Sequence, residues 1–207
     1  MLCLMRLREY ILGSPRMYTL WQWIISRKGL NEKIITNFLQ PYEGMRVLDV
    51  GSGVSNILTI LPKCTYVGID HNEEYVQLAN SKYGDVATFY CADVSDIKQL
   101  VQHKFDRILL LRIMHHLSDN EVIELLRECS QLLNHNGLIL TMDCAFTADQ
   151  HWIAKFLAAQ DRGHFVRRPE QYAQLVCEEL KIVKMNVVEG LLRVPYTHVI
   201  FQFTNES

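Results

Sequence analysis

The chain has 207 residues, of which 49% are hydrophobic and 21% are charged, and its formal net charge at pH 7 is −2. This length suits a single domain with a substantial core, and we expect residues 1–207 to form one unit. A near-neutral charge argues against DNA or RNA as a partner, because nucleic-acid binding usually calls for clustered Lys and Arg. No segment approaches the roughly twenty apolar residues of a membrane span.

The six cysteines are scattered, with no C-x-x-C pair and no spacing typical of a zinc site. We therefore expect no metal centre, and free thiols that pack as small hydrophobic side chains. The N-terminus lacks the apolar core and the small-residue cleavage site of a secretory signal. The simplest interpretation is a reduced, cytoplasmic protein.

Residues 1–42 are predicted to form a helical cap. One helix ends in a break near Gly29, and a second runs through Leu39. The first 40 residues carry six Lys or Arg against two Glu. Two interpretations stay open: a lid over a bound ligand, or a weak contact with a membrane surface that presents a lipidic acceptor. The apolar stripe of the first helix consists of Tyr18, Trp21, Ile24 and Ile25.

A strand, a glycine turn and a helix follow, beginning with VLDVGSGVSN at Val47–Asn56. The apolar residues up to Val50 suit a buried parallel strand. Gly51 and Gly53 let the backbone turn sharply and approach a ligand without a Cβ in the way. Residues 57–61 are predicted to be the helix. This order of elements is typical of a site for a nucleotide-like ligand.

The residues around the turn distinguish two classes of cofactor. A dinucleotide fingerprint requires a third glycine, where this chain has Asn56, and an acidic residue about twenty positions on, which Asp70 supplies. Asp49, just before the turn, would repel a pyrophosphate. A third carboxylate, Asp93, follows the next strand. Carboxylates at three strand ends instead suit S-adenosylmethionine, which carries an ammonium, a sulfonium and two ribose hydroxyls but no phosphate.

The remaining chain alternates strands and helices, which predicts an α/β fold with a parallel sheet covered on both faces. Strands are expected at residues 66–70, 87–90, from 105, 182–188 and 198–203. Helices are expected at residues 73–82, from Ser95 as N-cap, from Ser118 or Asp119 to Leu133, and over residues 145–178. The apolar residues expected to face inward from the longest of these helices are Val122, Leu125, Leu126 and Cys129.

From about Met45 onward, the chain resembles the class I S-adenosylmethionine-dependent methyltransferases. FDRILLLRIMHHL, Phe105–Leu117, is similar to the family's fourth strand and the loop after it. LLNHNGLILTMD, Leu132–Asp143, is similar to its helix, turn and fifth strand, with His-Asn-Gly where Pro-Gly-Gly is more usual. The resemblance implies a Rossmann-like core over residues 45–207, with a seven-stranded, mostly parallel sheet whose last strand lies antiparallel beside the fifth.

The resemblance also implies a cofactor site. In the family, the residues that match Asp49, Gly51 and Gly53 hold the methionine end of the cofactor. The match of Asp70 binds the ribose, and the match of Asp93 meets the adenine. The neighbours that complete the predicted cofactor site are Ser52, His71, Val94 and Leu111.

Two positions depart from the family's pattern. Ser55 stands where a third glycine is frequent, and Arg112 stands where a small residue is common beside the methyl-transfer site. We place Arg112 in the acceptor pocket, where its long side chain would change the shape of that pocket.

Methyl transfer needs an aligned nucleophile and, for a hydroxyl acceptor, a group that removes a proton. His115 and His116, in the loop after the fourth strand, are the catalytic candidates, with His116 ahead. The competing interpretation is that one imidazole braces the next helix. Asp143, at the end of the fifth strand, is assigned to orienting an acceptor or to capping the following turn.

Basic residues near the C-terminal third suggest contacts with an acidic acceptor. Arg193 stands alone in an apolar run and either points into the acceptor pocket or pairs with Glu189. A second group is predicted to be either a cationic rim for a carboxylate or phosphate, or a helix-capping charge cluster. Its members are Arg162, His164, Arg167 and Arg168.

The sequence therefore predicts methyl transfer from S-adenosylmethionine to an oxygen, nitrogen or carbon of a small molecule, by a monomer or a homodimer. Two alternatives stay open. A catalytically inactive, methyltransferase-like subunit would be consistent with Ser55 and Arg112. A nicotinamide-dependent oxidoreductase would share the first strand, but it would lack the third glycine and face Asp49.

Overall fold

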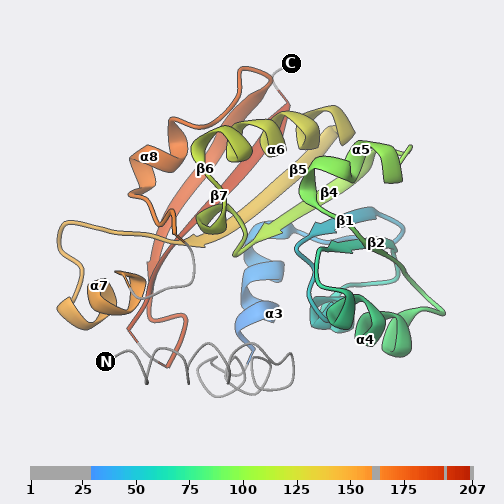
Figure 1. Ribbon diagram of the computed structural model, residues 1–207, viewed down its shortest axis with the longest axis horizontal. Helices are drawn as coiled ribbons and strands as arrows, with labels where there is room; N and C mark the ends of the chain where they lie inside the picture. Colours follow the sequence, from blue (N-terminus) through green and yellow to red (C-terminus); the bar gives the residue numbers. More distant parts are fainter. Residues whose placement is uncertain (1–28, 160–163, 194, 206–207) are drawn as a thin grey trace.

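The chain forms one seven-stranded sheet with helices on both faces (Figure 1). The computed structural model describes residues 29–159, 164–193 and 195–205. The strands are β1 (Arg46–Val50), β2 (Thr65–Asp70), β3 (Thr88–Cys91), β4 (Phe105–Leu111), β5 (Leu133–Cys144), β6 (Leu180–Glu189) and β7 (Thr197–Asn205).

The strand order is β3-β2-β1-β4-β5-β7-β6. Strands β1 to β5 pair in parallel, and β7 lies antiparallel between β5 and β6. The order reverses direction at β1, from which β2 and β3 run to one side and β4 and β5 to the other. The α/β class and the antiparallel position of the last strand beside the fifth are therefore confirmed.

Helices α5, α6 and α8 cover one face of the sheet, and α3 and α4 lie on the other (Figure 1). The α-helices are α3 (Leu30–Ile34), α4 (Glu73–Tyr83), α5 (Ile97–Leu100), α6 (Asp119–Leu132), α7 (Trp152–Ala159) and α8 (Pro169–Ala173). A π-helix, η1 (Ile35–Leu39), and three 3-10 helices, η2 (Asn56–Ile60), η3 (Val94–Asp96) and η4 (Met114–His116), complete the set.

Strand β1 is buried on both faces, and its side chains alternate between two apolar clusters. Leu48 and Val50 pack in the cluster beneath α6, whereas Val47 packs with Tyr66 in the cluster beneath α3 and α4. Because side chains alternate along a strand, Asp49 faces the same side as Val47. The strand's alternation therefore directs this carboxylate toward Tyr66.

Side chains of the sheet bind the described part of the N-terminal cap through backbone carbonyls at the end of its helix. The Arg107 Nε donates to the carbonyl of Leu39 at 2.8 Å, and the Gln202 Nε2 donates to that of Phe38 at 2.7 Å. These bonds satisfy carbonyls that a helix end leaves without partners. The predicted apolar stripe over residues 18–25 lies outside the described residues, so the lid and the membrane contact stay predictions. No helix in the described ranges is long and apolar enough to cross a membrane.

Helix α6 begins as predicted at the Ser118 N-cap. The Glu121 Oε2 accepts from the Ser118 backbone N at 2.7 Å and from its Oγ at 2.6 Å, which fixes the first turn. The four predicted inward residues, from Val122 to Cys129, are all buried. The N-cap residue and the helical spacing of apolar residues were therefore enough to predict this helix from the sequence.

The helix expected at residues 57–61 is present as the short 3-10 helix η2, which starts after Ser55 in a left-handed conformation. Two other local predictions were wrong. Ser95 is not an N-cap: it lies within η3, and α5 begins only at Ile97. Between α7 and α8 the described residues 164–168 are not helical, and Arg167 forms a bridge with Ala145, the residue after β5. A contact distant in sequence thus overrides the local helical preference.

Candidate active site

The glycine turn after β1 is fixed to the end of β2. The backbone N atoms of Gly51 and Ser52 donate to the carbonyl of Ile69 at 2.8 and 3.0 Å. Gly51 has φ 71°, and a Cβ there would lie 3.1 Å from Ile113 Cδ1 in the loop after β4. Both the left-handed backbone and this close approach require glycine. The turn therefore lies where β1, β2 and β4 end.

Asp70 holds the second half of the turn. Its Oδ2 accepts from the Gly53 N at 2.8 Å, and its Oδ1 accepts from the Asn72 N at 2.9 Å. Asp70 is buried, whereas the neighbouring His71 is exposed, with its Nδ1 3.7 Å from Asp70 Oδ1. The carboxylate therefore has a fixed orientation at the edge where ligands of open α/β sheets bind.

Asp49 is buried beside the turn and accepts a hydrogen bond from the Tyr66 hydroxyl. Burial raises the pKa of the Asp49 carboxyl to about 7, although the Tyr66 hydrogen bond and the positive charge of Arg112 act in the opposite direction. A cationic ligand group beside Asp49 would favour the ionised form further. Sequence reasoning missed Tyr66, although its place on the same face of the adjacent strand was a usable signal.

A cavity of about 560 Å³ opens between the ends of β2 and β3. His71 and Asp93, two predicted cofactor residues, line it, and Val94 follows at the start of η3. The other lining residues, which no sequence pattern indicated, are Cys91, Ala92, Asp96, Gln99 and Leu100. The cavity adjoins Asp70 through His71, so it suits the nucleoside base of a ligand whose ribose meets that carboxylate.

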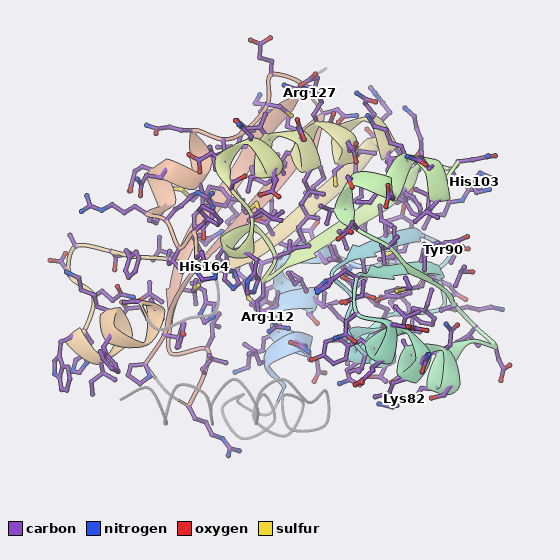
Figure 2. The ribbon with its side chains drawn as sticks, viewed as in Figure 1. Lys82, Tyr90, His103, Arg112, Arg127 and His164 are labelled. Carbon is purple, nitrogen blue, oxygen red and sulfur yellow. The ribbon has the colours of Figure 1, made fainter. Side chains whose placement is uncertain are left out.

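Arg112 follows Leu111 at the carboxyl end of β4, as Figure 2 shows. It has φ 62°, a conformation that is uncommon for a residue with a side chain, and its backbone N donates to the carbonyl of Met142 at 2.7 Å. Its charge acts on the buried Asp49 carboxyl. Arg112 therefore lies beside the glycine turn.

His115 is held by Asp143. The His115 Nδ1 lies 2.7 Å from Asp143 Oδ1, and the His115 backbone N donates to the same oxygen at 3.2 Å. Both residues are buried, and the second Asp143 oxygen has no hydrogen-bond partner among the described residues. Because a carboxylate only accepts, the His115 Nδ1 carries a proton in this arrangement, and Asp143 holds the ring in one tautomer. The exposed His116 ring lies 4.2 Å from the His115 ring.

Arg167 is not part of a cationic rim. Its guanidinium is buried and donates to Asp119 Oδ1 at 2.6 and 2.8 Å. It also donates to three backbone carbonyls, those of Met114, Leu117 and Phe165. Arg167 therefore fastens the loop after β4 to the chain that follows α7. Of the remaining predicted group, Arg168 is the N-cap residue of α8, His164 is exposed, and Arg162 lies outside the described residues.

A second cavity, of about 270 Å³, lies between the start of α7 and the connection from β6 to β7. Arg193 lines it together with His151, Glu189 and Tyr196. Arg193 and Glu189 form no ion pair within the described chain, so the pairing alternative is not what the structure shows. The cavity carries groups of both charges and an aromatic ring.

The model of a methyltransferase domain family matches residues 41–197. The chain belongs to this family of class I S-adenosylmethionine-dependent methyltransferases. Membership excludes the nicotinamide-dependent oxidoreductase. It also accounts for the pattern around the glycine turn of this methyltransferase, with Asp49 before it and no third glycine after it.

Among curated relatives, the ubiquinone biosynthesis O-methyltransferase of Rhizobium etli is 26% identical over 166 residues, which cover 78% of this chain and 66% of that protein. The N-terminal Xaa-Pro-Lys N-methyltransferase 1 of Danio rerio is 27% identical, with 55% of each chain covered. The matches thus span less than two thirds of these relatives' lengths. The crystal structure of the N-methyltransferase NodS from Bradyrhizobium japonicum WM9, in complex with S-adenosyl-l-homocysteine, superposes with a TM-score of 0.65 at 13% identity over 86% of each chain. This likeness shows the shared fold.

Proposed function

We propose that this methyltransferase transfers the methyl group of S-adenosylmethionine to a hydroxyl oxygen of a small-molecule acceptor. The observation that carries the proposal is the position of Asp49, Asp70 and Asp93 at the carboxyl ends of the adjacent strands β1, β2 and β3, with Asp70 bonded to the glycine turn. In a member of this family, that arrangement supplies carboxylates for a cationic nucleoside and leaves the loop after β4 for the acceptor.

Different residues of the site would bind different parts of the cofactor. Asp70 accepts from the ribose hydroxyls, Asp49 faces the ammonium of the methionine end, and the cavity between His71 and Asp93 takes the adenine. When bound, S-adenosylmethionine supplies a methyl carbon that the sulfonium makes electrophilic. The chain's own task is to align an acceptor with that carbon, exclude water and accept a proton.

An oxygen acceptor is favoured because the site contains an oriented imidazole pair. A hydroxyl must lose its proton as it attacks, and a positioned histidine contributes typically about 10²–10⁴-fold to such steps. We assign His116 as the proton acceptor and His115 as a positioning residue that Asp143 holds in one tautomer. The ubiquinone biosynthesis O-methyltransferases among the relatives support an oxygen acceptor.

The acceptor is proposed to enter beside the loop after β4 and to reach the cavity that Arg193 lines. Its mixed lining suits an amphipathic small molecule better than an extended polymer. Arg162 is retained as a predicted contact outside the described residues. The cytoplasmic location and the monomeric or dimeric state also stay predictions from the sequence.

The proposal is tested by two measurements on the full chain. Calorimetric titration should show binding of S-adenosylmethionine and S-adenosylhomocysteine, and incubation of a cell extract with methyl-labelled cofactor should place label in small molecules. Absence of cofactor binding would overturn the proposal. Cofactor binding without any labelled product would instead favour the catalytically inactive subunit.

The histidine assignment has its own test once an acceptor is identified. His116→Gln should lower kcat about 100-fold and leave the Kd of S-adenosylhomocysteine unchanged. Asp143→Asn should lower kcat and shift its pH profile through the tautomer of His115, while His103→Gln, exposed far from Arg112 in Figure 2, serves as the control. An unchanged kcat in His116→Gln would assign the proton to another group.

A further inference from the structure

We propose that Arg112 binds the carboxylate of the cofactor's methionine end, on the opposite side of its α-carbon from Asp49, which faces the ammonium. This inference rests on the proposed use of S-adenosylmethionine. It moves Arg112 from the acceptor pocket, where the sequence placed it, into the cofactor site.

The backbone places Arg112 beside the glycine turn. Arg112 N donates to Met142 O at 2.7 Å, which fixes the first residue after β4. The next residue, Ile113, is so close to Gly51 that any Cβ on the glycine would lie 3.1 Å from its Cδ1. Arg112 is also one of only three residues other than glycine with positive φ in the described ranges. Such a conformation persists where the surrounding structure imposes it.

The Arg112 guanidinium has no paired anion in the described parts of the chain. Its positive charge acts on Asp49, yet the two side chains form no ion pair, and the guanidinium makes no ion pair or hydrogen bond with any other residue in the described parts of the chain. Arg112 is half-buried, so its side chain is only partly exposed to water. A guanidinium in this position is suited to a carboxylate, which it binds through two parallel hydrogen bonds.

The chemistry of the cofactor supplies that anion. S-adenosylmethionine has a single anionic group, the carboxylate, and it is attached to the same carbon as the ammonium. An α-amino acid is therefore recognised by an acidic side chain that binds its ammonium and a basic side chain that binds its carboxylate, on either side of that carbon. Asp49 at the end of β1 and Arg112 at the end of the neighbouring β4 provide this pair. An anionic group on the acceptor is the competing ligand for Arg112.

The test compares a ligand that carries the amino-acid carboxylate with two ligands that lack it. Calorimetric titrations of the full chain would use S-adenosylhomocysteine, decarboxylated S-adenosylmethionine, and 5′-methylthioadenosine, which lacks the amino-acid end. Arg112→Gln should weaken S-adenosylhomocysteine binding at least about tenfold and leave the other two affinities unchanged. Arg112→Lys should retain part of the affinity. The matched control is Arg127→Gln, an exposed arginine on α6 that Figure 2 shows well away from Arg112.

Each other outcome overturns the inference. Equal loss for all three ligands would mean that Arg112 only shapes the site. Unchanged S-adenosylhomocysteine binding in Arg112→Gln, while the wild-type chain binds it, would return Arg112 to the acceptor and leave the proposed function intact. Failure of the wild-type chain to bind S-adenosylhomocysteine would overturn the proposed function together with the inference.

Discussion

The two halves of the active site are built by contacts of very different range. On the cofactor side, Asp70 binds Gly53 and Tyr66 binds Asp49, each across 17 residues. On the acceptor side, Asp143 binds His115 across 28 residues, and Arg167 reaches Asp119 across 48. The cofactor side is thus assembled by the neighbouring strands β1 and β2, whereas the acceptor side joins β4 and β5 and also needs Arg167, which reaches it from the chain beyond α7.

This difference predicts how substitutions in each half affect stability and cofactor affinity. A strand-turn-strand unit keeps its geometry through local backbone bonds, such as those from Gly51 and Ser52 to Ile69. The loop after β4 instead depends on one side chain, Arg167, for three of its contacts to distant chain. Substitutions on the acceptor side should therefore cost stability, and substitutions on the cofactor side should cost mainly affinity.

The largest expected effect is on the acceptor side. Arg167→Met should lower the free energy of unfolding by about 3 kcal/mol, because three backbone carbonyls, one buried and two partly buried, lose their donor. Urea denaturation monitored by circular dichroism would measure it. The matched Arg127→Met removes only an exposed ion pair with Glu179, at 3.6 Å, and should cost less than about 1 kcal/mol. Equal effects of the two substitutions would contradict the comparison.

The cofactor side is tested by removing the carboxylate that holds its turn. Asp70→Ala should weaken S-adenosylhomocysteine binding at least about 100-fold, because two hydrogen bonds from ribose hydroxyls to a charged oxygen are lost. Calorimetric titration gives the Kd, and near-ultraviolet circular dichroism establishes that the variant is folded. Asp85→Ala, at an exposed position after α4, should bind as the wild type does. An unaffected Kd in Asp70→Ala would remove Asp70 from the ribose site.

A smaller effect concerns pH. The pKa of Asp49 is raised by burial to about 7 in the unliganded chain, and a cationic ligand favours its ionised form. Cofactor affinity should therefore rise with pH, about tenfold between pH 5.5 and 7. Asp49→Asn should flatten this profile in calorimetric titrations at several pH values, and a profile as steep as that of the wild type would assign the titration to another group.

The sign for stability is the reverse. A carboxyl whose pKa is higher in the folded chain than in the unfolded chain favours folding most at low pH, where it is protonated in both states. The contribution of Asp49 to the free energy of unfolding should thus be fully present below about pH 4 and be lost as the pH rises through about 7. Unfolding of Asp49→Asn should lack this dependence.

The same difference in range explains what the sequence could predict. The run of apolar residues predicted β1 and β2, and the helical spacing of apolar residues after an N-cap serine predicted α6. The glycine turn and the aspartates at three strand ends indicated a cationic nucleoside. Each of these strand ends and caps can be recognised from a few adjacent residues. The bridge from Arg167 to Ala145 had no local signature, so the chain after α7 was assigned to helix. The contact between Asp143 and His115 could not be predicted either, because an aspartate at a strand end has the same sequence pattern whether it faces an acceptor or a histidine. Tyr66 falls between these cases, as strand pairing alone would have placed it beside Asp49.

The smallest effect concerns Ser55, the departure from the family's pattern within the turn. Ser55 has φ 54°, a conformation that costs a residue with a Cβ roughly 1–2 kcal/mol, while glycine loses about 0.4–1 kcal/mol more chain entropy on folding. Ser55→Gly should therefore raise the free energy of unfolding by about 0.5 kcal/mol, and the melting temperature by about 1–2 °C. The Kd of S-adenosylhomocysteine should not change.

The matched substitution Ser81→Gly, in the last turn of α4, should act in the opposite direction, because glycine is less favourable than serine in a helix. Differential scanning calorimetry would compare the two variants. Opposite signs would show that Ser55 imposes a backbone cost that this side of the site absorbs without loss of binding. Tighter cofactor binding in Ser55→Gly would instead show that the serine impairs the site, as the catalytically inactive subunit requires.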